Sequence, residues 1–231
     1  MSRSRLPSPT QPDVHARQTQ AASKVARTAA QEVRIIGGQW KRTPLPVPLA
    51  AGLRPTPARV RETLFNWLGQ DLTGWRVLDA FAGSGALGLE AASRGATSVC
   101  LIEREPTLVR SLKAVVQRLA SPGHAAASCV SVIQADALSW MAQHAARQES
   151  PFDLVFLDPP FDEGLFEQAL KAALGCVPAG GWVYLESPQE LGVEALAGLR
   201  RQRHGRAGAV HFHLFQRVGE APVEADSARQ P

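Results

Sequence analysis

The sequence predicts an α/β protein whose central sheet is doubly wound and mainly parallel. From Trp75 onward, short apolar runs alternate with segments in which apolar residues recur at helical spacing, which is the succession expected of βαβ units. A glycine-rich turn joins the first of these runs to the first helix, as in sheets that bind nucleotide-type ligands. The chain has 231 residues and is 45% hydrophobic, so it can bury one large core.

The two ends of the chain depart from this pattern. Residues 1–31 are rich in Ser, Arg, Gln, Ala and Pro, so we expect a disordered tail there, although an organellar transit peptide has a similar composition. Residues 220–231 are expected to be equally loose. The sequence therefore predicts an N-terminal extension over 32–70, formed by a hairpin and a helix, and a main domain over 71–219.

Local signals define the two parts of the extension. The segment Val33–Arg42 predicts a hairpin that turns at its adjacent glycines, and the prolines that follow keep the chain extended. Thr56 and Pro57 form an N-cap and first-turn pair. Apolar residues at helical spacing then predict an amphipathic helix that ends near Gly69.

The main domain is expected to alternate strands and helices. The predicted strands lie at 76–79, 98–102, 130–133, 152–157, 181–186 and 210–215. The predicted helices lie between them, the first ending near 94, the second beginning at 106, and the others at 138–146 and 165–174. The last strand alternates polar and apolar residues, so we expect it to be antiparallel. Ligands of such sheets bind at the carboxyl ends of the strands.

Carboxylates and glycines stand at the ends of the first three predicted strands. Asp79 ends the first strand, and Gly83 and Gly85 follow it, where the lack of side chains lets a ligand approach the backbone. Glu103 ends the second strand, where a carboxylate can accept both hydroxyls of a ribose. Asp136 follows the third strand, where it can accept the amino group of an adenine or cap the next helix. These positions predict a nucleotide-type cofactor.

NAD(H) and S-adenosylmethionine both fit the glycine-rich turn. The carboxylate of Asp79 distinguishes them, because it would repel a pyrophosphate and attract a cationic aminoacyl-sulfonium ligand. We therefore favour S-adenosylmethionine. The alternative for the turn is a tight connection without a ligand.

The stretch Asp158-Pro159-Pro160-Phe161 follows the fourth buried run. It combines a carboxylate, carbonyl groups without competing N–H donors, and an aromatic ring. These groups suit the binding of a planar base by its exocyclic amine; the alternative is a proline-stiffened turn after a core strand. Guanine, with two adjacent donors, matches a carboxylate better than adenine does, but similar motifs also serve adenine methylation.

Several motifs lie partly outside the generic nucleotide-binding pattern. They are Arg34–Trp40, Gly52–Thr56, Arg59–Leu68 and Phe81–Ala91. Together with Glu103, the Asp136 turn and the Asp158 stretch, they resemble the RsmD family, whose members are bacterial small-subunit ribosomal RNA guanine-N2 methyltransferases. The similarity covers roughly Val33 to Arg217, and the long leading tail departs from the compact family pattern.

The resemblance implies a Rossmann-like class I methyltransferase fold, with a seven-stranded, mostly parallel sheet and an antiparallel last strand. It implies methylation of a specific guanine N2 amine in small-subunit ribosomal RNA, within a ribonucleoprotein particle, with S-adenosylmethionine as donor. The implied catalytic residues are Asp158, Pro159, Pro160 and Phe161. The implied cofactor contacts are Asp79, Phe81, Gly83, Gly85, Glu103 and Asp136.

Cations are concentrated in the extension. The net charge is only +4, but residues 34–61 contain six cations and no acid. Because phosphate contacts supply much of the affinity for nucleic acid, the predicted RNA contacts are Arg34, Lys41, Arg42, Arg54, Arg59 and Arg61. The alternative for the hairpin is an edge extension of the sheet with Trp40 as a packing residue. A second cationic cluster lies between 200 and 206.

Other features exclude several protein classes. The three cysteines are widely spaced, which argues against disulfides or a zinc site and favours a reducing cytoplasm. His211 and His213 lie on one face of the last strand, and without a third ligand we expect exposed residues and no metal. No apolar run is long enough to span a membrane. Nothing in the sequence requires a dimer, so we expect a monomer.

Three alternatives stay open at this point. The enzyme could methylate adenine N6 in DNA or RNA, or a protein glutamine. The chain could instead be a non-catalytic RNA-binding protein with a degenerate cofactor pocket. An NAD-dependent dehydrogenase is disfavoured, because the Asp158 stretch has no place in hydride transfer.

Overall fold

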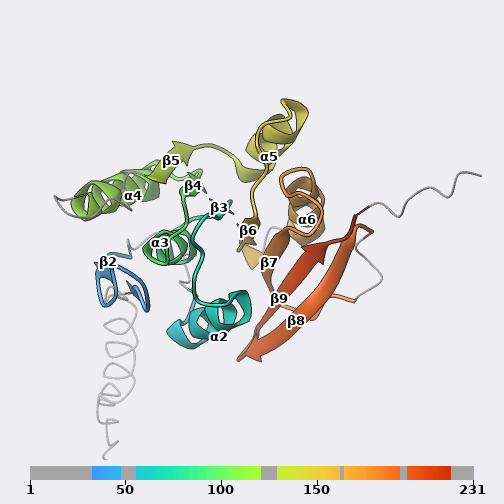
Figure 1. Cartoon of the computed structure of the whole chain (residues 1–231), viewed down its shortest axis with the longest axis horizontal. Helices are drawn as coiled ribbons and strands as arrows, with labels where there is room; N and C mark the ends of the chain where they lie inside the picture. The colour runs from blue at the N-terminus through green and yellow to red at the C-terminus, as the bar shows by residue number, and fades with distance from the viewer. Residues whose placement is uncertain (1–32, 48–55, 121–128, 162–163, 193–196, 220–231) are drawn as a thin grey trace, which may run out of the picture. The chain divides into compact units, whose positions relative to one another are not determined.

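The computed structural model describes residues 33–47, 56–120, 129–161, 164–192 and 197–219, which contain a seven-stranded sheet (Figure 1). The strands are β3 Arg76–Asp79, β4 Ser98–Glu103, β5 Val130–Gln134, β6 Leu154–Leu157, β7 Trp182–Ser187, β8 Leu199–Ala207 and β9 Val210–Arg217. Their order across the sheet is β5-β4-β3-β6-β7-β9-β8. Strands β3 to β7 are parallel, and β9 is antiparallel to both neighbours. The predicted fold class, including the antiparallel last strand, is confirmed.

The order of the strands reverses at β3, which is the first strand of the sheet along the chain. It passes to β4 and β5 on one side of β3, then returns to β6 and β7 on the other side. At such a reversal the connections diverge, and the carboxyl ends of the two central strands border a crevice where ligands bind. Asp79 of β3 is in register with Phe156 of β6, so the residues that follow these strands emerge side by side.

Helices cover both faces of the sheet. The helices are α2 Ala58–Leu68, α3 Ala86–Ser93, α4 Pro106–Leu119, α5 Ala137–Ala146 and α6 Phe166–Leu174. Buried residues of α2, α3 and α4 form one apolar cluster with Val77, whereas those of α5 and α6 form a second cluster with Leu78. Adjacent strand residues thus serve opposite faces, as expected of parallel strands buried on both sides.

The N-terminal hairpin is present, but it differs from the prediction. Its strands, β1 Val33–Arg34 and β2 Pro44–Leu45, pair in a separate two-stranded sheet. The second strand therefore begins later than predicted, and the hairpin does not extend the main sheet. Gly38 has a φ of 71°, and a Cβ at this position would collide with the carbonyl oxygen of Ser93 in α3. Glycine allows the hairpin to dock on α3, with Trp40 buried there.

Strand β8 was not predicted. Four of its nine residues are arginines, so the segment was interpreted as a charged cluster. In the structure it is the outermost strand of the sheet and pairs with β9. An edge strand tolerates charge because part of its surface faces water, and charged side chains also discourage pairing with other chains.

Parts of the sequence-based interpretation fall outside the described residues. These parts are the tails predicted over 1–31 and 220–231, and Arg54. Among the helices that the structure describes, none has the length and apolar character needed to cross a membrane.

Candidate functional site

The glycine-rich turn between β3 and α3 has a conformation that depends on glycine. Gly83 and Gly85 have φ values of 53° and 76°, in the left-handed region that disfavours side chains. A Cβ on Gly85 would also lie 2.7 Å from Cδ2 of Leu112 in α4. The N–H of Gly83 donates to Oε2 of Glu103 at 2.9 Å, which ties the turn to the end of β4. This hydrogen bond therefore fixes the turn at the carboxyl edge of the sheet.

Asp79 lies beneath this turn and is only 2% exposed. Its Oδ2 accepts the N–H of Gly88 at 2.9 Å. Burial, and to a smaller extent the nearby charge of Glu103, raises the pKa of Asp79 to about 7, against the stabilising hydrogen bond from Gly88. A carboxylate in this setting favours a cationic partner, because a positive charge offsets the loss of solvation.

Glu103 ends β4, and Asp136 follows β5, as predicted. Oε1 of Glu103 accepts the N–H of Glu105 at 2.9 Å, so this carboxylate also shapes the turn after β4. Asp136 is exposed and caps α5 by accepting the N–H of Ser139 at 2.9 Å, which lowers its pKa. The predicted capping role is confirmed, and the carboxylate retains lone pairs that can accept further hydrogen bonds.

The Asp158 stretch begins where β6 ends, at the same edge of the sheet as the glycine-rich turn. The N–H of Ala80 donates to the carbonyl oxygen of Phe156 at 3.1 Å, which joins the two strand ends. Asp158 is half-buried, Pro159 is buried and Pro160 is exposed. The half-buried Phe161 packs against Phe166 of α6, with ring centroids 5.9 Å apart. The structure thus brings together two motifs that are far apart in the sequence.

A second carboxylate, which the sequence analysis missed, lies near Asp158. Glu186 of β7 is 3% exposed, and its Oε1 accepts the hydroxyl of Tyr184 at 3.0 Å. The side chain of Thr56, which precedes α2, lies within hydrogen-bonding reach of Asp158 and Glu186 and lowers the pKa of both carboxyl groups, although its single hydroxyl proton can be donated to only one of them at a time. Burial raises the pKa of both carboxyl groups, and the charge of Glu186 raises that of Asp158 further. A carboxylate at the end of an apolar strand was the signal that could have revealed Glu186.

The role of Thr56 also corrects the prediction for α2. The helix begins at Ala58, and Pro57 occupies the N-cap position without a side-chain hydrogen bond. Thr56 is therefore not the cap. Its buried side chain instead lies near the two carboxyl groups of the site and lowers the pKa of both.

Arg61 requires a second correction. It was predicted to contact RNA, but it is 1% exposed. Its Nη1 donates to the carbonyl oxygen of Arg34 at 3.0 Å and lies 3.5 Å from Oε2 of Glu90 in α3. Arg61 is consequently a structural residue that joins the hairpin, α2 and α3, and it presents no charge to the surface.

The other described candidates for RNA contact are exposed. Lys41 and Arg42 lie in the connection between β1 and β2, Arg34 lies at the end of β1, and Arg59 lies in the first turn of α2. These four side chains can meet a phosphate backbone from the surface of the extension.

The histidines of β9 also differ from the prediction. His213 is completely buried, and His211 is half-buried, so neither is an exposed strand residue. The unpredicted strand β8 places His204 beside them, with its ring 4.7 Å from that of His213. This cluster lies on the sheet face opposite to α2.

The strand order, the glycine turn over Asp79 and the Asp158 stretch at one sheet edge define a Rossmann-like class I methyltransferase. Over residues 33–216 the sequence matches the family described as "Conserved hypothetical protein 95". The chain therefore belongs to this family, the RsmD family.

Individual relatives agree with this assignment. "Ribosomal RNA small subunit methyltransferase D" of Escherichia coli is 39% identical over 210 residues, covering 88% of this chain and 99% of the relative. The protein of the same name from Haemophilus influenzae is 38% identical over 190 residues, covering 81% and 95%. A solved structure described as "Putative methyltransferase yhhF from Escherichia coli" has a TM-score of 0.69 at 39% identity, covering 82% of this chain and 99% of that one.

Proposed function

We propose that the protein transfers the methyl group of S-adenosylmethionine to the exocyclic N2 amine of a guanine in small-subunit ribosomal RNA. The observation that carries the proposal is the meeting of the Gly83–Gly85 turn and the Asp158 stretch at one sheet edge. The relatives named as small-subunit ribosomal RNA methyltransferases support the substrate class. The choice of guanine N2 rests mainly on the motif resemblance. We further propose that the protein acts as a monomer on a cytoplasmic ribonucleoprotein particle.

The residues around the Gly83–Gly85 turn fit S-adenosylmethionine. S-adenosylmethionine supplies a methyl group that is already activated by a positively charged sulfur. The buried carboxylate of Asp79 would pair with a cationic part of the ligand, which would lower its raised pKa. Glu103 would accept the ribose hydroxyls and Asp136 the adenine amine, while Phe81 and the two glycines line the turn. This is the set of cofactor contacts predicted from the sequence.

The Asp158 stretch would orient the exocyclic N2 nitrogen of the guanine for methyl transfer. Its lone pair is delocalised into the guanine ring, so hydrogen bonds from the amine to Asp158 and to the Pro159 carbonyl would favour a pyramidal nitrogen. Pro159 and Pro160 carry no N–H that competes for these acceptors. Phe161 would stack on the base, a contact worth about 1–3 kcal/mol. A base within helical RNA would first have to be unstacked.

Analysis of the methylated product tests the proposal. Labelled S-adenosylmethionine is incubated with the protein and unmodified small subunits or naked ribosomal RNA, and the nucleosides are identified. We expect N2-methylguanosine. N6-methyladenosine or methylated protein glutamine would favour another amine substrate. Absence of both methylation and calorimetric cofactor binding would favour a non-catalytic RNA-binding protein.

Glu186 should set the pH dependence of the reaction. Burial and the charges of Glu186 and Asp79 raise the pKa of Asp158, so Asp158 takes up a proton at a higher pH than an ordinary carboxyl group. Activity that needs the ionised acceptor should therefore fall as the pH is lowered through this raised pKa. Glu186→Gln removes one like charge, and the acidic limb of kcat against pH should move to lower pH. An unchanged limb, or the same shift in the exposed control Glu167→Gln, would contradict this coupling.

The cations on the hairpin should strengthen RNA binding. Because Lys41 and Arg42 are exposed, the charge reversals Lys41→Glu and Arg42→Glu together should weaken binding to the small subunit. The slope of log affinity against log salt should fall by about one for each phosphate contact that is lost. The matched control reverses the exposed Arg110 and Lys113 of α4. Equal loss of cofactor affinity in the hairpin variant would argue against a separate RNA-binding surface.

A further inference from the structure

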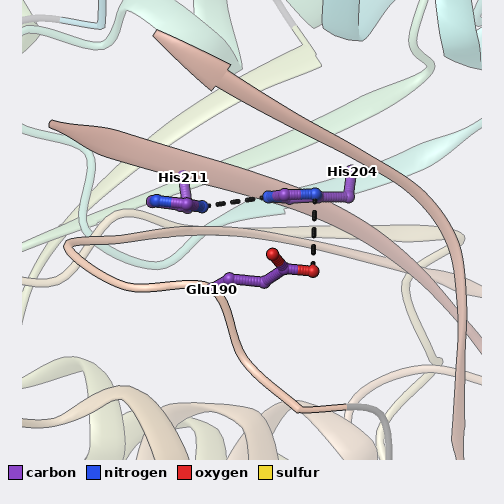
Figure 2. A group of neighbouring side chains, drawn as sticks. All are labelled: Glu190, His204 and His211. Atoms are coloured by element: carbon purple, nitrogen blue, oxygen red, sulfur yellow. Dashed lines mark hydrogen bonds and ion pairs between the residues drawn. The ribbon is translucent and has the colours of Figure 1, made fainter. Parts of the chain in front are cut away.

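Three side chains from separate segments converge beside the β8–β9 hairpin, as Figure 2 shows. Nε2 of His204 in β8 lies 3.0 Å from Nδ1 of His211 in β9, and Nδ1 of His204 lies 3.7 Å from Oε1 of Glu190. Glu190 belongs to the segment after β7. One ligand atom from each of the three residues can be chosen so that all lie within 4.8 Å of one another.

The sheet fixes the positions of the two imidazoles. His204 is in register with His213, and His211 is two residues from His213 on the same face of β9. The His204 and His211 rings are nearly parallel, at 8°, and His204 stacks on the buried His213 with centroids 4.7 Å apart. Nε2 of His213 lies 3.3 Å from the hydroxyl of Ser187. These contacts limit the movement of the two imidazole rings.

We propose that His204, His211 and Glu190 bind one divalent transition-metal ion of the zinc class. In a tetrahedral zinc site with bonds of about 2.0–2.1 Å, neighbouring donor atoms are about 3.3 Å apart. The 3.0 Å separation of the two imidazole nitrogens is close to this value. Two imidazoles and a carboxylate are donors that zinc, cobalt and nickel share, whereas Mg²⁺ and Ca²⁺ prefer oxygen ligands. Solvent would complete the coordination.

Arg201 holds the carboxylate in place for this role. Its Nη1 donates to Oε1 of Glu190 at 2.9 Å and to the carbonyl oxygen of Leu191 at 3.1 Å. The second carboxylate oxygen, Oε2, would then bind the ion, in the way that carboxylate ligands of metals are themselves hydrogen-bonded. The positive charge of Arg201 would repel the metal cation, and the negative charge of Glu190 would offset this repulsion.

Metal binding would join the segment after β7 to the β8–β9 hairpin. Glu190 lies four residues after Glu186, which contributes to the candidate active site. An ion on His204, His211 and Glu190 would tie this segment to the β8–β9 hairpin and reduce its freedom. The sequence analysis singled out only one of these ligands, His211, because His204 stands on the strand that was not predicted and Glu190 lies in the segment after β7.

Zinc titration of the full-length chain tests the site. The probe is Zn²⁺, added in a non-chelating buffer and followed by calorimetry, with Co²⁺ absorption in the visible range as a second readout. We expect one Zn²⁺ per chain and a rise in Tm for the wild type. His211→Ala and Glu190→Gln should each weaken binding at least about tenfold. The control Glu167→Gln makes the same chemical change as Glu190→Gln at an exposed residue of α6, outside the cluster, and should bind like the wild type.

The variants separate the possible results. Glu190 is exposed, so Glu190→Gln tests the ligand role even where His211→Ala reduces folding. Absence of Zn²⁺ binding by the wild type at about 10⁻⁴ M, a concentration in the range at which weak protein sites for Ca²⁺ fill, would overturn the proposal. Equal binding by the wild type and both cluster variants would overturn it too, as would loss of binding in Glu167→Gln alone.

Discussion

Replacing Asp158 by asparagine is expected to reduce the rate of methyl transfer on the order of a hundredfold, with little change in cofactor affinity. Asparagine keeps the size of the side chain and resembles the protonated form of the carboxyl group. It can offer one acceptor oxygen, but its amide nitrogen would face the amine that must be held. Because Asp158 follows β6 while Asp79 and the glycine turn follow β3, the change should affect the nucleophile more than the cofactor.

Single-turnover rates and calorimetry with S-adenosylmethionine measure the two effects separately. The matched control is Asp71→Asn, which makes the same chemical change at an exposed residue before β3, away from the carboxyl edge. We expect wild-type rates for this control. Full activity in Asp158→Asn would show that the carboxylate charge is not required, and a parallel loss of cofactor binding would show that the two sites are not separate.

The strand ends of the site could be predicted because their signals are local. Each parallel strand is an apolar run buried on both faces, so its boundaries are visible in the sequence. Parallel strands also present their carboxyl ends at one edge, and this geometry alone places Asp79, Glu103, Asp136 and Asp158 together. The antiparallel direction of β9 was predicted from the alternation of apolar residues and histidines in its sequence, but His213 is buried, so this alternation does not mark a solvent-facing side of the strand.

Other residues could not be predicted because their roles depend on tertiary contacts. Arg61 stands among exposed cations in the sequence, but a buried carboxylate from another helix determines its environment. Strand β8 is charged because it lies at the sheet edge, which only the strand order reveals. Thr56 has the sequence signal of a helix cap, yet the nearby carboxyl groups of Asp158, after β6, and Glu186, in β7, compete for its hydroxyl.

Replacing Glu90 by alanine is expected to destabilise the protein by about 3–5 kcal/mol, the usual range for breaking a buried ion pair. Glu90 is fully buried in α3. Its carboxylate accepts the N–H groups of Ile36 and Gly37, both at 2.7 Å, and lies 2.8 Å from Arg94 and 3.5 Å from Arg61. Alanine would leave two buried cations without this partner and two backbone donors unsatisfied.

The loss should be concentrated in the hairpin, because Glu90 connects α3 to both the hairpin and α2. Thermal and urea unfolding measure the total effect, and hydrogen exchange of residues 33–47 measures the local one. Glu90→Gln keeps the shape and an acceptor oxygen but removes the charge, so its loss should be intermediate. The exposed Glu167→Ala on α6 should change stability by no more than about 0.5 kcal/mol. If Glu90→Ala costs no more than this control, or if residues 33–47 keep their protection while the rest of the chain loses it, Glu90 does not anchor the hairpin.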